Sequence, residues 1–153
     1  MKGILMTPAT FVIFGASGDL THRKLVPALY NLYRKKRLQG GIRIVGYARR
    51  PYTNADFQAE MQRGVQQFSP ASYDEGLWNE FAQSLSYFQG DLGSLEDFKR
   101  LETTLQQVEG ENANRLYYLA TPPEYFLEII NGMASAGMLT ENGGWRRVVI
   151  EKP

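Results

Sequence analysis

The sequence predicts an α/β protein with a doubly wound parallel sheet, folded as one domain over residues 1–153. Two observations predict it, the alternation of two kinds of segment and the absence of any repeat or linker. Strand-length apolar runs alternate along the whole chain with segments whose apolar residues recur every three or four positions. Parallel neighbours need a crossover, so this alternation indicates a parallel sheet with helices on both faces. The absence of a repeat, a linker or a low-complexity tract favours a single domain.

The expected strands are short runs rich in β-branched and aromatic residues: 10–14, 42–48, 86–88, 116–120 and 148–150. Helical stripes are expected between them: Phe57 to Phe68, Tyr73 to Leu85, Phe98 to Val108, and Tyr125 to Met133.

Helix boundaries follow from capping and proline signals. Thr53 and Ser94 are expected N-caps, the former in a capping box with Asp56. Pro27 is tolerated only in the first turn of a helix. The sequence therefore predicts a short turn over Asp19 to Lys24 and a main helix that starts near Val26.

Composition excludes several classes of site. The chain has no cysteine and one histidine, His22, which argues against thiolate nucleophiles, disulfide scaffolds and a metal site. No apolar run approaches the length of a membrane span, and the first residues are too short for a signal peptide. We therefore expect a cytoplasmic protein without metal and without membrane contact.

Positive charge is concentrated near the amino terminus. Residues 1–50 carry ten Lys and Arg against Asp19 alone, a net +9, whereas residues 51–153 carry seven against fifteen acidic residues, a net −8. The first part is therefore expected to bind an anion. Nucleic acid is disfavoured, because the basic residues are dispersed among apolar runs and the total charge is near neutral.

A glycine turn joins the first expected strand to the first helix. It reads Gly15-Ala16-Ser17-Gly18-Asp19-Leu20. Gly15 allows the tight turn, and Gly18 allows the backbone to approach a pyrophosphate at the helix N-terminus. The spacing differs from Gly-x-Gly-x-x-Gly. An alternative interpretation therefore remains, in which the turn serves only the geometry of the chain and binds nothing. In its strand–turn–helix context, the turn favours a Rossmann-like dinucleotide site.

The end of the second expected strand indicates which dinucleotide binds. An NAD site has an acidic residue there for the ribose hydroxyls, whereas a 2′-phosphate needs a cation. Arg49 and Arg50 stand at this place, and no acidic residue occurs between Asp19 and Asp56. This favours NADP through Arg49, with a solvated arginine pair as the alternative.

Other chemistries lack their motifs. No tyrosine is followed four residues later by lysine, and no Gly-Lys-Ser/Thr occurs. His22 is expected to be solvated or to face the anion rather than to act as a base, because it has no evident orienting partner. Trp78, Trp145 and the tyrosines are expected in the core, with Tyr118 as the exception.

Four blocks together resemble the glucose-6-phosphate dehydrogenase family. They are Gly15 to Leu20 with Lys24, then Gly46-Tyr47-Ala48-Arg49, then Tyr118-Leu119-Ala120-Thr121-Pro122-Pro123, and Glu151-Lys152-Pro153. Their order and separations match those of the family. The resemblance covers this whole chain and corresponds to the amino-terminal dinucleotide domain of the family.

The resemblance implies roles for individual residues. The turn from Gly15 to Leu20 would bind the NADP pyrophosphate, Arg49 the 2′-phosphate, and Tyr118 with Pro122 the nicotinamide half. Lys152 would contact both cofactor and substrate, and Lys24 the sugar phosphate. The family commonly has a cis bond before the proline that matches Pro153.

Two positions depart from the family pattern. Thr21 stands where alanine is usual, and His22 stands where lysine is usual. We expect Thr21 to loosen the packing of the first helix slightly. We expect His22 to remove one positive charge near the pyrophosphate.

The resemblance also implies an activity. The family moves a hydride from C1 of glucose 6-phosphate to NADP, and the histidine base and phosphate-binding block lie in a second domain that this sequence lacks. No catalytic residue is therefore assigned here. The full protein would be a homo-oligomer, whereas this chain could be a monomer. A stand-alone NADP-sensing module and an NADP oxidoreductase with another substrate remain alternatives.

Overall fold

The computed structural model describes residues 9–38, 41–141 and 143–151. Its centre is a five-stranded sheet in the order β3-β2-β1-β4-β5, and every neighbouring pair is parallel. The strands are β1 (Ala9–Phe14), β2 (Arg43–Ala48), β3 (Leu85–Gln89), β4 (Asn114–Leu119) and β5 (Arg146–Ile150). The predicted Rossmann-like fold class is confirmed.

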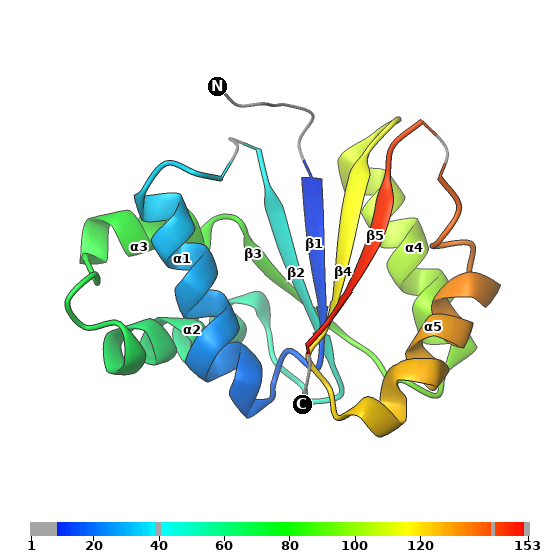
Figure 1. Ribbon diagram of the computed structural model, residues 1–153, viewed down its shortest axis with the longest axis horizontal. Coiled ribbons are helices and arrows are strands. Elements are labelled where there is room, and N and C mark those ends of the chain that lie inside the picture. The colour runs from blue at the N-terminus through cyan, green and yellow to red at the C-terminus, as the bar shows by residue number, and fades with distance from the viewer. Residues whose placement is uncertain (1–8, 39–40, 142, 152–153) are drawn as a thin grey trace.

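Helices cover both faces of the sheet (Figure 1). On one face lie η1 (Thr21–Leu25), α1 (Val26–Arg34), α2 (Asn54–Phe68) and α3 (Glu75–Ala82). On the other lie α4 (Leu95–Glu109) and α5 (Phe126–Ser135), the latter preceded by η2 (Pro123–Tyr125). Each layer encloses its own apolar cluster, because alternate side chains of β1 and β2 point to opposite faces.

The first helix is continuous where the sequence predicted a break. Residues 19–34 are helical throughout, with one wide π turn over Thr21–Leu25. The Val26 N–H donates to the Thr21 carbonyl, five residues back. This turn shifts the hydrogen-bond register just before Pro27, which has no N–H to offer, so the helix continues through the proline. The α-helical segment α1 begins at Val26 as predicted, but it continues the π turn without a break.

Capping fixes the starts of the other long helices. Thr53 and Asp56 form the predicted capping box, with hydrogen bonds of 2.9 and 3.0 Å. The Ser94 hydroxyl accepts from the Asp97 N–H at 3.2 Å, as predicted. The stripe expected from Tyr73 to Leu85 was too long: Asp74 caps α3, and Leu85 already belongs to β3.

Some predicted core residues lie at the surface instead. Phe68, Val108 and Tyr125 are 40%, 51% and 42% exposed, and each lies at or next to the end of a helical element. Trp78 is buried as predicted. Trp145 is only half-buried, and the Arg147 guanidinium lies 4.4 Å from the centre of its ring.

Within the described ranges, no helix is both long and apolar enough to cross a bilayer. The same ranges contain no group of three side chains placed to hold a metal ion.

Candidate functional site

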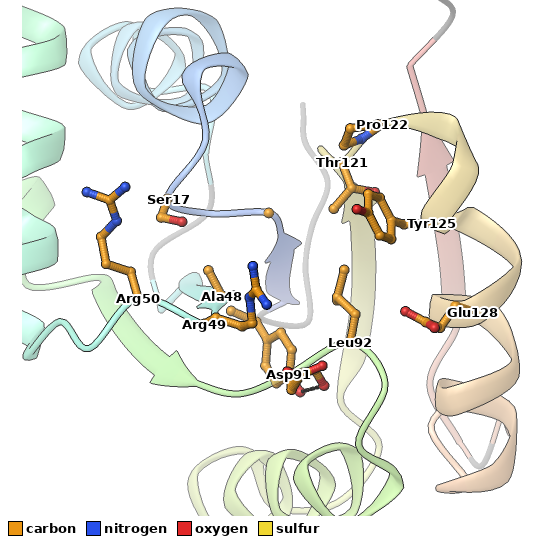
Figure 2. Close-up of a pocket in the computed structure, with 12 residues that line it drawn as sticks. Ser17, Ala48, Arg49, Arg50, Asp91, Leu92, Thr121, Pro122, Tyr125 and Glu128 are labelled. Carbon is orange, nitrogen blue, oxygen red and sulfur yellow. Dashed lines mark hydrogen bonds between the residues drawn. The ribbon is translucent and has the colours of Figure 1, made fainter.

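A cleft of about 490 Å³ opens at the carboxyl ends of the central strands. From β1 the chain proceeds to β2 on one side, while β4 lies on the other, so the cleft is at the switch point where parallel α/β sheets bind ligands. Its lining consists of Gly15, Ser17, Tyr47, Ala48, Arg49, Arg50, Asp91, Leu92, Thr121, Pro122, Tyr125 and Glu128 (Figure 2).

The floor of the cleft is the glycine turn after β1. Gly15 has a φ of +88°, and a Cβ there would lie 2.8 Å from the Ala120 carbonyl oxygen. Only glycine fits this conformation and this close approach to β4. The Gly15 carbonyl accepts the Gly18 N–H at 3.0 Å and the Thr21 hydroxyl at 3.2 Å. The buried Thr21 hydroxyl ties the helix to the turn, and the expectation that Thr21 loosens the packing of the helix stays a prediction.

The end of β2 forms one wall. The Tyr47 ring is buried, and its hydroxyl donates to the Asp91 carbonyl at 2.7 Å. Burial, with the nearby Asp97 and Asp91 carboxylates, raises the pKa of Tyr47, so the phenol stays protonated and keeps donating. A Cβ at Gly90 would lie 2.5 Å from the Tyr47 ring. The loop that carries Asp91 is therefore held against β2 by a glycine and a hydrogen bond.

Arg49 and Arg50 follow β2, and both are exposed. Figure 2 shows the Arg49 guanidinium directed toward the middle of the cleft, whereas the Arg50 side chain lies at its side, near Ser17 in this view. Arg50 lies 5.8 Å from the Tyr52 ring centre, and its carbonyl accepts the Tyr87 hydroxyl at 2.6 Å. Within the described residues neither arginine forms an ion pair. Arg49 is thus a cation placed for an incoming anion.

The opposite wall comes from the segment after β4. Thr121, Pro122, Tyr125 and Glu128 face the cleft from the turn, η2 and α5. The Thr121 hydroxyl is buried without a hydrogen-bond partner in the described part of the chain. An unpaired buried hydroxyl beside a cleft is a ready contact for a polar ligand group.

The structure brings together only part of the predicted site. Gly15, Ser17, Arg49 and Pro122 line the cleft. The other turn residues support it: Ala16 is fully buried behind it, Gly18 ends the turn, and Asp19 and Leu20 form the start of the helix.

Two further predicted contacts, Lys24 and Tyr118, do not line the cleft. Lys24 is exposed on η1. Tyr118 is half-buried on β4 and hydrogen-bonds to the Glu151 carboxylate, and burial followed by this bond raises the pKa of Tyr118 to about 12. Lys152 and the bond before Pro153 lie outside the described residues.

Sequence reasoning missed Asp91, Leu92, Tyr125 and Glu128. Asp91 and Leu92 follow the carboxyl end of β3, which was a usable signal, because all parallel strands end at the same edge of the sheet. Tyr125 and Glu128 carry no such signal. Both had the spacing of helix residues, and the path of the turn after Pro122 decides where they point.

His22 has an orienting partner that its sequence context did not reveal. Its Nδ1 lies 3.6 Å from the Glu60 carboxylate, and its ring meets Phe68 edge-on at 5.8 Å. Both partners come from α2. The imidazole therefore faces α2 and is absent from the cleft lining, which corrects the expectation of a solvated or anion-facing side chain.

The cleft combines an open backbone turn with an exposed cation. The glycine turn leaves the backbone open to a pyrophosphate at a helix N-terminus, and the nearest side-chain charge at the end of β2 is the Arg49 guanidinium. A guanidinium presents several N–H donors in a plane that matches phosphate oxygens. Asp91 lies on the same side of the cleft as Arg49, whereas Glu128 lies on α5 across from it.

Comparison with known proteins gives a consistent result. Residues 12–153 match the family described as "Glucose-6-phosphate dehydrogenase, NAD binding domain". Glucose-6-phosphate 1-dehydrogenase of Chlamydia pneumoniae is 41% identical over 95% of this chain, and that of Schizosaccharomyces pombe is 37% identical over 93%. The chain spans 30% and 28% of the length of these two relatives.

Solved structures agree. A structure described as glucose-6-phosphate dehydrogenase in complex with its substrate glucose-6-phosphate superposes with a TM-score of 0.85 at 32% identity, covering all of this chain and 32% of the other. Glucose-6-phosphate 1-dehydrogenase from Mycobacterium avium gives 0.82 at 28% identity, covering 95% of this chain and 30% of the other.

Proposed function

The chain belongs to the family of glucose-6-phosphate dehydrogenase NAD-binding domains, and from this membership we propose that it binds NADP in the cleft after β1, β2 and β4. In a longer protein it would form the cofactor half of an enzyme that oxidises glucose 6-phosphate to 6-phosphogluconolactone. A cytoplasmic location follows from the same proposal. Because the chain spans about a third of its relatives, the activity is proposed for a protein of their length.

The observation that carries the preference for NADP is the position of Arg49. Its guanidinium points into the cleft from the end of β2, where an NAD site would have a carboxylate. The nearest acidic residues in sequence, Asp19 and Asp56, are engaged elsewhere, by Arg23 at 2.9 Å and by the Thr53 capping box. A 2′-phosphate would therefore meet the Arg49 cation. The carboxylate that lines the cleft beside it, that of Asp91, has one oxygen occupied by the Gly93 N–H at 2.8 Å.

The other cleft residues would hold the rest of the dinucleotide. The Gly15 turn would accept the pyrophosphate, with Ser17 beside it, and the Thr121 hydroxyl and Pro122 would contact the half that carries the nicotinamide. When bound, NADP supplies the hydride acceptor. The chain's residues would bind and orient it, and among the described residues that line the cleft the carboxylates of Asp91 and Glu128 are the groups that could accept a proton.

Lys24, Lys152 and Tyr118 remain predictions. Lys24 is exposed on η1, so it could meet a sugar phosphate held by another part of a longer protein. Tyr118 would contact the nicotinamide half only if its hydroxyl reached past the Glu151 carboxylate that it now binds.

Calorimetric titration with NADP and NAD tests the proposal. The matched control for Arg49→Ala is Arg43→Ala, which removes the same charge at the other end of β2. A charge-assisted hydrogen bond contributes about 1.5–3 kcal/mol, so Arg49→Ala should weaken NADP about ten- to a hundredfold and barely change NAD. Arg43→Ala should change neither. Equal losses for both cofactors, or no binding of NADP by the unaltered chain, would overturn the proposal.

A further inference from the structure

Glu128 is a carboxylate of the cleft to which NADP binding, as proposed so far, gives no role. It lies in the first turn of α5 and lines the cleft, and Figure 2 shows its side chain directed from the helix toward Leu92. Among the residues that the structure describes, it forms no ion pair. A free carboxylate beside an anionic ligand opposes binding, unless it faces a ligand group that donates hydrogen bonds.

The carboxylate of Glu128 reaches the loop before α4. Its Oε2 lies 3.9 Å from the position that a Cβ at Gly93 would take, and Oδ1 of Asp91 lies 3.5 Å from the same position. The Asp91 oxygen already accepts the Gly93 N–H at 2.8 Å. Of the two carboxylates that line the cleft, Glu128 is therefore the one whose oxygens are both available to a ligand.

Two apolar side chains accompany this carboxylate. In the view of Figure 2, Leu92 lies between Arg49 and Glu128, and the Tyr125 ring lies close to Leu92. Leu92 is half-buried, and Tyr125 is 42% exposed. An exposed aromatic ring beside an aliphatic side chain suits a planar ring of a ligand, because a heteroaromatic base can stack on such surfaces. This part of the cleft thus combines apolar surface with an acceptor at its end.

The position of Arg49 decides which part of a dinucleotide reaches Leu92 and Tyr125. The 2′-phosphate of NADP and its adenine are attached to neighbouring carbons of one ribose, so the base lies beside the phosphate. In Figure 2, Ser17 of the glycine turn lies on one side of Arg49, and Leu92 lies on the other. A pyrophosphate at the turn and a 2′-phosphate at Arg49 therefore direct the base toward Leu92.

We propose that Glu128 accepts a hydrogen bond from the exocyclic amino group of the adenine, and so selects adenine over a base with an oxygen at that position. The inference rests on the proposed binding of NADP. The amino group is the N–H donor of adenine, and a carboxylate is an acceptor only. Leu92 and Tyr125 contact the faces of the base, while Glu128 meets its amino edge.

The other hydrogen-bond donors of the dinucleotide have other places in the proposed arrangement. The ribose that carries the 2′-phosphate lies at Arg49, and the carboxamide belongs to the half assigned to Thr121 and Pro122. The adenine amino group is the donor left for Glu128. Its contact with the carboxylate offsets the repulsion between Glu128 and the phosphates.

Calorimetric titration with NADP and with nicotinamide hypoxanthine dinucleotide phosphate tests the proposal. The analogue has a carbonyl oxygen in place of the amino group and keeps the phosphates, the riboses and the nicotinamide. The unaltered chain should bind NADP about tenfold or more tightly than the analogue, because the Glu128 carboxylate would otherwise face an oxygen that accepts and does not donate.

Glu128→Gln should remove most of this preference. A glutamine amide accepts from an amino group through its oxygen and donates to a carbonyl through its nitrogen. The substitution also removes a negative charge, which should strengthen the binding of both dinucleotides alike, so the readout is the ratio of the two dissociation constants. Glu124→Gln is the matched control, because Glu124 is exposed on η2 and does not line the cleft. It should leave the ratio unchanged.

Equal binding of the two dinucleotides by the unaltered chain overturns the proposal, and so does a ratio that Glu128→Gln leaves unchanged. A ratio lost in Asp91→Asn but kept in Glu128→Gln would assign the amino group to Asp91, which also overturns it. In these three cases NADP still binds, so the proposed function stands. A chain that binds neither dinucleotide overturns both.

Discussion

The Thr21 hydroxyl donates a hydrogen bond to the Gly15 carbonyl, 3.2 Å away, across the turn that forms the floor of the cleft. Thr21 is fully buried, and the same carbonyl also accepts the Gly18 N–H. One backbone oxygen therefore anchors both the turn and the helix that follows it. The shape of the glycine turn depends on a side chain four residues beyond the lining residue Ser17.

Thr21→Val should destabilise the chain by about 1 kcal/mol, because it keeps the shape of the side chain but removes the donor. Urea unfolding measures the loss. Thr103→Val is the matched control, since its exposed hydroxyl donates to the Lys99 carbonyl at 3.1 Å and competes there with water. If both variants lose the same free energy of unfolding, then burial of the Thr21 hydrogen bond does not add to its contribution.

Gly15→Ala should destabilise the chain by about 1–3 kcal/mol and reduce NADP binding. The added Cβ would combine a left-handed backbone with a contact of 2.8 Å to the Ala120 carbonyl oxygen. Gly110→Ala separates the two effects, because Gly110 has a φ of +76° with no atom within 4 Å of its Cβ position. Equal losses of unfolding free energy in the two variants would show that the close approach to β4 costs nothing.

The alternation of strands and helices was predictable because each buried strand is a continuous apolar run, as in Val12 to Phe14. Capping boxes were predictable because they are local. The continuous first helix was not, since the π turn before Pro27 depends on packing against α2, where the backbone of His22 approaches Gly64.

The site was predictable only where it is carried by the strand ends. Gly15 and Arg49 follow β1 and β2 directly, so the order of elements places them together. Tyr125 and Glu128 depend on the path of the chain after Pro122. Arg115 shows a further limit: it is 1% exposed, held by Glu109 at 2.8 Å and by Glu102, and a charged residue gives no sequence signal of burial.

Acid should weaken the fold through Asp97, which holds the loop before α4. Its carboxylate accepts from Arg100 at 2.8 Å and from the Asp91 N–H at 2.9 Å, and these bonds lower the pKa of Asp97 below its usual range. A lowered pKa means that Asp97 contributes stability above about pH 4, and that this contribution is lost as the pH falls through the lower value in the folded chain.

Asp97→Asn should therefore make the fall of unfolding free energy below about pH 4 less steep, as measured by urea unfolding at a series of pH values. Glu96→Gln is the control, because Glu96 is exposed and lies 3.7 Å from Lys99 in a weak surface pair. Asp97 does not titrate as proposed if Asp97→Asn leaves the fall of unfolding free energy at low pH unchanged. The same conclusion follows if Glu96→Gln changes that fall as much.

The chain alone should not oxidise glucose 6-phosphate, even with saturating NADP. General acid–base catalysis is typically worth about 10²–10⁴ in rate, and holding the substrate beside the cofactor up to about 7–11 kcal/mol of barrier. The cleft offers neither: His22 packs against Glu60 and Phe68, away from the lining, and the described residues provide no second wall for a sugar phosphate. The absorbance of NADPH measures turnover, with the full-length Chlamydia pneumoniae relative as the positive control. Turnover by the chain that disappears in His22→Ala would make His22 a base and contradict this account, whereas turnover that survives His22→Ala would place the base among Asp91 and Glu128.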